Sequence, residues 1–298
     1  MLSCMDEIDL LLRKLRAARN PESLAKAVDD LRHSEDPRVR LALRHKLDEL
    51  ERPAVRYVSA AMKETLLLSL MRFRDPDDWA IAAKAMQTYV FLPPNHTEVA
   101  SGYRAAGLRL AAAVEQDGAR FYAAQLLVDP HTSELTGQPA VTASQILGQS
   151  GDDLALYMRL GGISALTAEV VASCLSELSR IPVKAIPYLV NKWKLNPDPV
   201  VQLALVDLLI DHEQHEQLAS ELESLVRSTD SVELVEYIGA KLVATRRIVL
   251  IETLAAVTDF GSNGHDKHQA LRRIWMDLEA TRSSPAAQRE ERKKLPTP

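Results

Sequence analysis

The chain contains little glycine, few aromatic residues and almost no cysteine. Of its 298 residues, 11 are glycine and 5% are aromatic. Its two cysteines, Cys4 and Cys174, lie far apart, which excludes a disulfide framework and a Cys-x-x-Cys metal site. A core must therefore be built mainly from leucine, alanine, valine and isoleucine. Leucine and alanine also favour helices locally, so this composition suits packed helices.

Long apolar runs and an excess of basic residues are also lacking. No segment reaches the ~20 apolar residues that a helix needs to cross a bilayer. The formal net charge of −5 argues against a dedicated nucleic-acid binder, which usually carries a basic excess. The N-terminal segment places acidic residues before a short apolar run, whereas a secretory signal begins with basic ones. We therefore expect a cytoplasmic protein that does not bind membranes.

What the chain does have is a repeated helix start. An Asp-Pro or Gln-Pro pair precedes a small apolar helix face at 36–43, 75–86, 138–147 and 198–209. Aspartate is a favourable residue just before a helix, and proline suits the first helical position, where its missing N–H is not needed. A unit that recurs every ~30–45 residues predicts stacked repeats rather than one compact core.

Apolar residues at steps of three and four predict a series of helices, most of them in pairs. The stripe of segment 37–50 consists of Val39, Ala42, Leu43, Leu47 and Leu50. A polar loop is predicted at 129–138. The other predicted helical segments are 8–15, 22–33, 54–73, 77–91, 97–115, 119–128, 139–149, 152–160, 164–180, two within 186–211, 214–228, 231–244, 247–259 and 266–281.

These segments predict an all-α protein. We expect a right-handed α-solenoid, or α–α superhelix, of about six or seven helix pairs, with residues 1–281 as its single domain. Residues 282–298 are charged, bracketed by proline and without an apolar face. We expect them to form a flexible polar tail.

The doublet of an apolar helix and an Asp-Pro-x-Val-x-x-Ala-Leu helix resembles the HEAT repeat, including the short version found in bilin-lyase-type proteins. The best matches are LAKAVDDLRHSEDPRVRLALRHKLDEL at 24–50 and IPYLVNKWKLNPDPVVQLALVDLL at 186–209. Weaker versions occupy most of 22–281. The chain is also similar to bacterial HEAT-repeat proteins with a DPxxWAxxAxxAL segment, here DPDDWAIAAKAM. The resemblance implies the fold but not the function, because HEAT-like families use this fold to scaffold proteins, to attach bilins or to excise bases.

Motifs for catalysis and metal binding are incomplete. In the stretch from His212 to Glu216, a zinc protease motif would need histidine at position 216. We expect a polar turn there; the alternative is a metal held by His212, His215 and Glu216. The stretch 265–268 is expected to be a turn and a capped helix start. With no phosphate loop and no Gly-x-Ser-x-Gly elbow, we predict no catalytic residues, no cofactor, no metal and no enzyme activity.

The resemblance also indicates where a partner would bind, because the second helices of HEAT pairs usually line the concave surface. Polar residues on these helices could suit phosphates or an acidic peptide, although acidic neighbours dilute the positive charge, and the alternative is an ordinary solvated face. Trp193, flanked by lysines, is the candidate exposed aromatic residue, whereas we expect Trp79 and Trp275 in the core. The candidate partner-binding residues are Arg40, Arg44, Lys84, Trp193, Gln202, Lys241 and Arg272.

The function expected from the sequence is a non-catalytic interaction scaffold that binds a protein or peptide on its concave face. The alternative is a nucleic-acid-binding or base-excision protein similar to the alkylpurine-glycosylase HEAT proteins. That function needs a continuous basic groove with an exposed aromatic residue and a carboxylate. A third function, bilin lyase, needs a cleft of chromophore size, and no residue favours it.

Overall fold

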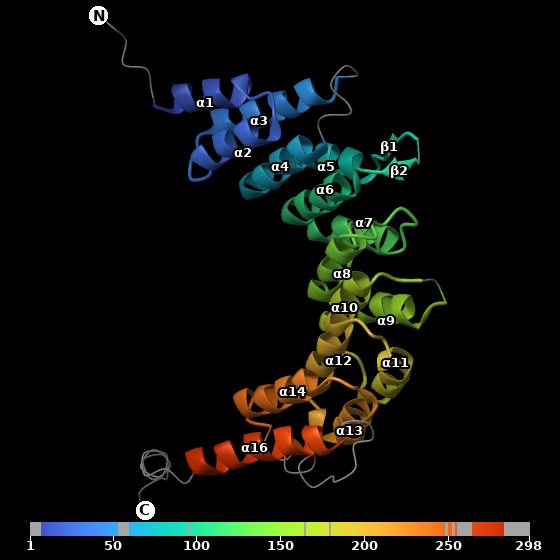
Figure 1. The fold of residues 1–298 in the computed structure, drawn as a ribbon. Helices are drawn as coiled ribbons and strands as arrows, with labels where there is room; N and C mark the ends of the chain where they lie inside the picture. Colours follow the sequence, from blue (N-terminus) through green and yellow to red (C-terminus); the bar gives the residue numbers. More distant parts are fainter. Residues whose placement is uncertain are drawn as a thin grey trace, which may run out of the picture. The chain divides into compact units, whose positions relative to one another are not determined.

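The computed structural model describes residues 7–52, 60–94, 96–163, 165–178, 180–247, 250–251, 254 and 264–282, with side chains of the last helix up to Met276. The chain divides into two compact units, residues 1–155 and 156–298. The described residues are mostly helical, as the sequence predicts (Figure 1). Among them, no helix is both long enough and apolar enough to cross a bilayer.

The described residues of unit 1 form a series of helices with a β-hairpin between two of them. Helix α2 contacts α4, α4 contacts α6, and α6 contacts α8, so these four helices form one row. The two strands, β1 and β2, pair antiparallel between α5 and α6. The helices and strands are α1 (Glu7–Ala17), α2 (Pro21–Asp30), α3 (Pro37–Leu50), α4 (Ala60–Leu70), α5 (Trp79–Met86), β1 (Phe91–Leu92), β2 (Thr97–Glu98), α6 (Ser101–Val114), α7 (Gln116–Leu127) and α8 (Ala140–Gln149).

Unit 2 has the same kind of organisation. Its helices α10, α12, α14 and α16 form a row in which each contacts the next, and α11 contacts α12 and α13. Helix α9 (Asp153–Gly161) contains the boundary between the two units. The other α-helices among the described residues of unit 2 are α10 (Ala168–Ser176), α11 (Ile186–Trp193), α12 (Pro199–Asp211), α13 (Ala219–Ser228), α14 (Val232–Ala244) and α16 (Gly264–Arg282).

Three of the four repeated helix starts act as caps, whereas α8, which follows Gln138-Pro139, begins without a side-chain cap. The Asp36 carboxylate accepts a hydrogen bond of 2.8 Å from the Arg38 backbone N–H at the start of α3. Asp198 accepts one of 2.9 Å from Val200 at the start of α12, so both predicted caps are confirmed. At 75–86 the same cap begins a single 3₁₀ turn, which leads into α5. A carboxylate in these positions satisfies a first-turn N–H that has no partner within the helix.

The predicted apolar faces form the core. All five residues of the stripe predicted for α3 are buried. Close contact of helices also requires small residues: a Cβ added to Gly107 of α6 would lie 2.7 Å from Cβ of Ala85 on α5. Trp79 and Trp275, expected in the core, are only half-buried.

The main difference from the predicted helices lies between α5 and α6. The predicted helix 77–91 ends at Met86, and the predicted helix 97–115 begins at Ser101, because the β-hairpin lies between them. Most of the predicted helix 247–259 lies outside the described residues. So does the predicted tail 282–298, except that Arg282 ends α16.

Replacing Leu205 by alanine tests the packing of α12. Leu205 is fully buried, so Leu205→Ala should lower the free energy of unfolding by about 2–5 kcal/mol, through lost apolar burial and a residual cavity. The control is Pro199→Ala on the same helix, which should matter little because other residues are also tolerated in the first turn. Urea denaturation measures both. A Leu205→Ala effect below ~0.5 kcal/mol, typical of exposed sites, would contradict the packing.

Candidate functional site

A buried arginine joins the hairpin of unit 1 to the loop after α7. Arg104, in the first turn of α6, is fully buried. Its Nη1 lies 2.8 Å from Glu98 Oε1 at the end of β2, and its Nε lies 3.3 Å from Asp129 Oδ2. Its Nη2 donates a hydrogen bond of 2.8 Å to the His131 carbonyl oxygen. One guanidinium group thus connects three residues from two segments that lie far apart along the chain.

The two carboxylates are held in place by backbone N–H groups. Glu98 Oε1 accepts hydrogen bonds from the N–H groups of Ala100, at 2.7 Å, and Val90, at 3.2 Å. Asp129 Oδ1 accepts one of 2.8 Å from the N–H of His131. Both carboxylates are almost completely buried. Buried charges are tolerated when they are paired and hydrogen-bonded. Each carboxylate here is paired with Arg104 and accepts hydrogen bonds from backbone N–H groups. Glu98 Oε2 has no hydrogen-bond partner among the described residues, and Arg104 Nε and Nη1 meet the carboxylates as ion pairs without hydrogen-bond geometry.

Three aromatic rings lie next to this ionic group, and we call Tyr89, Phe91 and His131 the aromatic cluster. The rings of Tyr89 and Phe91 are nearly parallel, with centroids 6.5 Å apart. The His131 ring meets both edge-on, at 5.6 Å from Tyr89 and 5.1 Å from Phe91. Below them, the Arg104 guanidinium carbon lies 4.2 Å from the Tyr89 ring centroid, which is the geometry of a cation–π contact.

The Tyr89 hydroxyl connects the cluster to the ionic group. It donates a hydrogen bond of 3.2 Å to Asp129 Oδ2. Burial and the nearby Asp129 carboxylate raise the pKa of Tyr89, since both disfavour a phenolate. The hydroxyl therefore keeps its proton and remains a donor. This bond holds the ring by its polar end, while part of the Tyr89 side chain remains exposed at the surface.

The residues of the aromatic cluster are exposed, whereas the ionic group next to them is buried. Tyr89 is 37% exposed and Phe91 40%, and His131 is exposed as well. Further apolar side chains are exposed on the neighbouring segments: Leu135 in the same loop, and Phe121 and Val128 along α7 and its end. Figure 1 shows the hairpin, with the labels β1 and β2. Apolar side chains that gather at a surface mark candidate interaction sites.

In unit 1, the residues predicted to bind a partner are engaged within the protein. Arg40 forms ion pairs with Asp75, at 2.8 Å, and Asp78, at 3.0 Å, and Asp78 is fully buried. Arg44 lies 3.7 Å from the same Asp78 carboxylate. Lys84 pairs with Glu51, which also accepts a hydrogen bond from the Tyr103 hydroxyl. These three residues lie on α3 and α5, outside the row of α2, α4, α6 and α8.

In unit 2, three of the four predicted residues lie on the row of α10, α12, α14 and α16. Lys241 pairs with Asp207, at 2.5 Å, and with Asp211, at 2.8 Å. Gln202 is buried and bonds to the chain before α12. Arg272 of α16 is exposed. Trp193 of α11 is half-buried, with Lys192 Nζ 5.4 Å from its ring centroid.

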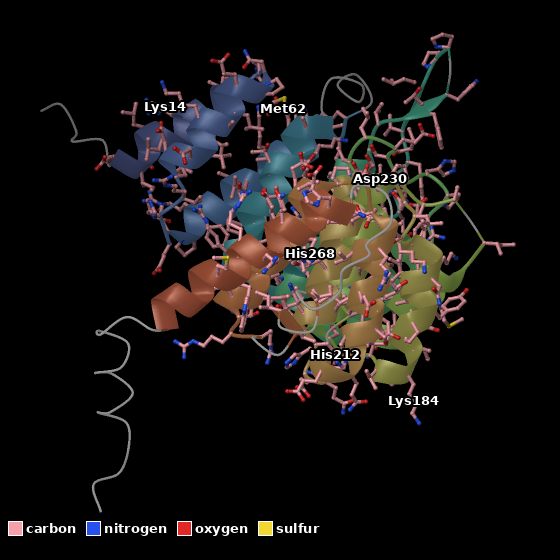
Figure 2. All side chains as sticks on the ribbon, turned by 60° about the horizontal axis from the view of Figure 1, so that its bottom comes forward. Lys14, Met62, Lys184, His212, Asp230 and His268 are labelled. Atoms are coloured by element: carbon pink, nitrogen blue, oxygen red, sulfur yellow. The ribbon has the colours of Figure 1, made fainter. Side chains whose placement is uncertain are left out.

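The histidines considered as metal ligands bond to backbone groups. His212, at the end of α12 (labelled in Figure 2), places Nε2 2.9 Å from the Ile181 carbonyl oxygen, and its Nδ1 accepts from the N–H of Gln214. His215 is buried and places Nδ1 3.2 Å from the His212 carbonyl oxygen. Within the described part of the chain, no three histidine, cysteine or acidic side chains come together in a metal-binding group.

The aromatic cluster was missed by sequence reasoning, although a signal for it exists. The run Tyr-Val-Phe-Leu at 89–92 is aromatic and β-branched, and Pro93 and Pro94 follow it directly. Such a run bounded by proline indicates a short strand and a turn rather than the end of a helix. The loop at 129–138 was predicted, but nothing in the sequence indicated that Arg104 would contact both segments.

Comparison with protein-family models, with curated proteins and with solved structures finds no match to this chain.

The contribution of Arg104 can be tested by replacing it with methionine. Arg104→Met leaves two buried carboxylates without their cation, so the free energy of unfolding should fall by about 3 kcal/mol. Arg104→Lys should restore only part of this, because an ammonium group lacks the planar fork that reaches three oxygens. The matched control is Arg109→Met, at a half-buried site on the same helix, with an expected change of about 0.5 kcal/mol. Equal urea midpoints for the two methionine variants would contradict the assignment.

Proposed function

We propose that this protein is a non-catalytic interaction scaffold that binds a protein or peptide partner. The observation that supports this most is the aromatic cluster, whose exposed rings lie next to the buried ion pairs of Arg104 with Glu98 and Asp129. Tyrosine is enriched among the residues that contribute most to protein interfaces. Side chains that are already fixed before binding also lose little conformational entropy when a partner docks, so more of the contact energy remains as affinity.

The order of helix contacts supports a finer proposal about the fold. We infer that the helix pairs stack as HEAT-like repeats in a right-handed α-solenoid. Within each unit, every second helix contacts the next one in its row. This nearest-neighbour pattern is typical of repeat proteins, in which each repeat buries its apolar face against the adjacent repeats. The repeats then supply a framework, and the segments between them supply specificity.

Within this proposal, the partner docks on the aromatic cluster rather than on the predicted basic residues. The charges of Arg40, Lys84 and Lys241 are each paired with carboxylates of the same protein. To bind a partner through these charges, the protein would have to give up its internal ion pairs. Phe91, in contrast, presents apolar surface that is already exposed to solvent. We expect the partner to insert an apolar side chain, such as leucine or phenylalanine, against these rings.

The same pairing weakens the support for the nucleic-acid alternative. Binding to phosphates depends on cations that can release counterions from the nucleic acid. The carboxylates of Asp75, Asp78 and Glu51 lie within ion-pair distance of the predicted basic residues of unit 1 and reduce the local positive potential. Exposed aromatic rings also stack on unpaired bases. The experiment below therefore separates a protein partner from a nucleic acid.

Replacing Phe91 by serine tests the proposed docking site. Phe91→Ser removes an exposed ring without touching the buried ions, so the fold should persist while the affinity for the partner falls at least tenfold, about 1.4 kcal/mol. The protein and its variant are used to capture partners from the native host with and without nuclease. The affinity of the recovered partner is then measured with purified components.

The control variant is Leu41→Ser, which changes an exposed apolar residue on α3, outside the aromatic cluster. It should retain the partner. The proposal would be overturned if Phe91→Ser and Leu41→Ser bound the partner equally well. Recovery of nuclease-sensitive material alone would favour the nucleic-acid alternative instead.

A further inference from the structure

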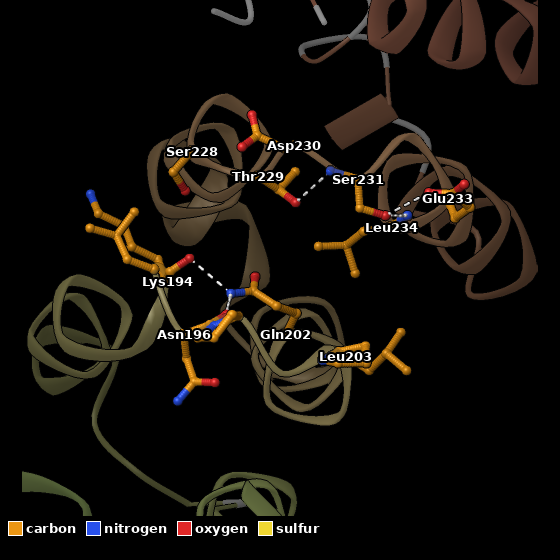
Figure 3. A pocket seen from close by; sticks show the side chains of 13 residues that line it. Lys194, Asn196, Gln202, Leu203, Ser228, Thr229, Asp230, Ser231, Glu233 and Leu234 are labelled. Carbon is orange, nitrogen blue, oxygen red and sulfur yellow. Dashed lines mark hydrogen bonds between the residues drawn. The ribbon is translucent and has the colours of Figure 1, made fainter. Parts of the chain in front are cut away.

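A cavity in unit 2 lies between the turn that precedes α12 and the turn that precedes α14. Its volume is about 590 Å³, within the range typical of small-molecule sites. Leu195, Pro197 and Leu203 contribute apolar walls from one side, and Leu234 contributes from the other. Figure 3 shows this cavity from close by, with the two turns facing each other. It lies in a different unit from the aromatic cluster and does not depend on it.

Gln202 is a buried polar side chain in the lining of this cavity. It is 8% exposed. Its Nε2 donates hydrogen bonds to the carbonyl oxygens of Lys194, at 2.8 Å, and Asn196, at 2.7 Å, which fixes the orientation of the amide. Its Oε1 is therefore turned away from that loop, toward the turn before α14 (Figure 3). Among the described residues, this buried oxygen has no hydrogen-bond partner.

Most polar donors of the cavity are already used inside the protein. Lys194 Nζ donates to Ser224 at 3.0 Å, and the Ser228 hydroxyl donates to a carbonyl oxygen of its own helix. The Ser231 hydroxyl donates to Glu233 at 2.9 Å. The Gln202 oxygen remains as an acceptor, and the carboxylates of Asp230 and Glu233 also belong to the lining. A ligand that pairs with Gln202 Oε1 must therefore donate a hydrogen bond.

We propose that this cavity binds an amphipathic amine, in which an aliphatic or aromatic group fills the apolar walls and an N–H group donates to Gln202 Oε1. A buried acceptor without a partner is unfavourable, so a ligand that supplies a donor gains that hydrogen bond on binding. A carboxylate of the same shape has no donor and would bring a second acceptor against Gln202 Oε1, so it should bind more weakly than the amine. The amine can be a free small molecule or the lysine side chain of a peptide, since both present the same chemistry.

Three probes test this proposal on the full chain. They are phenethylamine, phenylacetate as an anionic counterpart without a donor, and a short peptide with lysine between two leucines. Binding is followed by the backbone amide signals of the non-proline residues of 194–203 and of residues 228–234. We expect saturable shifts with phenethylamine or with the peptide, and at least tenfold weaker binding of phenylacetate. Tighter binding of the peptide identifies a side chain as the source of the amine, and tighter binding of phenethylamine identifies a free molecule.

Two tryptophan variants of α12 locate the binding. Leu203→Trp fills the cavity without removing Gln202 and should abolish the shifts. Val200→Trp makes the same kind of change at a half-exposed position of the same helix that does not line the cavity, and should leave binding intact. The proposal is overturned if no probe gives a saturable shift, if phenylacetate binds as well as phenethylamine, or if Leu203→Trp binds like Val200→Trp.

Discussion

The buried guanidinium group of Arg104 holds together the non-helical part of unit 1. The hairpin and the loop after α7 each bring a carboxylate to it, and neither segment has a large apolar core of its own. Arg104 can reach both because α6 contacts α4, α5, α7 and α8 and is thereby fixed in position. Helix packing thus places the cation, and the cation places the two segments. The orientation of the exposed Tyr89 ring depends on its contacts with Asp129 and Arg104, and Phe91 stacks on that ring.

The two proposed sites share a principle, although their chemistry differs. Both include a segment that connects one helix to the next, and the cavity of unit 2 is also lined by residues of α12 and α14. Helix faces are used for packing, whereas connecting segments can vary without disturbing that packing, so they are the usual place for function. In unit 1 the connection presents exposed rings for a partner. In unit 2 two connections enclose a cavity, where Gln202 leaves an acceptor free for a ligand.

Several features of the fold could be predicted because they depend on residues close together in the chain. The caps at Asp36 and Asp198 involve an N–H two residues away, and the stripe of α3 follows from helical spacing alone. The hairpin was missed because the apolar run before Pro93 continues the helical pattern of α5, and only pairing with a second strand distinguishes the two. The run at 89–92 carried a local signal for a strand, but the contact of its rings with His131 could not be predicted, because His131 lies in a loop forty residues further along the chain.

The sequence by itself determined the helical class, the capped starts of α3 and α12 and the buried face of α3, because each of these is encoded by local spacing and by capping residues. Tertiary structure alone decided which charged residues are available to a partner. Arg40 and Lys84 look like free surface cations in the sequence, yet their carboxylate partners lie more than thirty residues away. Arg104 looks like an ordinary helix residue and is fully buried. Ion pairing and burial depend on which helices stack against each other, and that is settled only when the whole unit has packed.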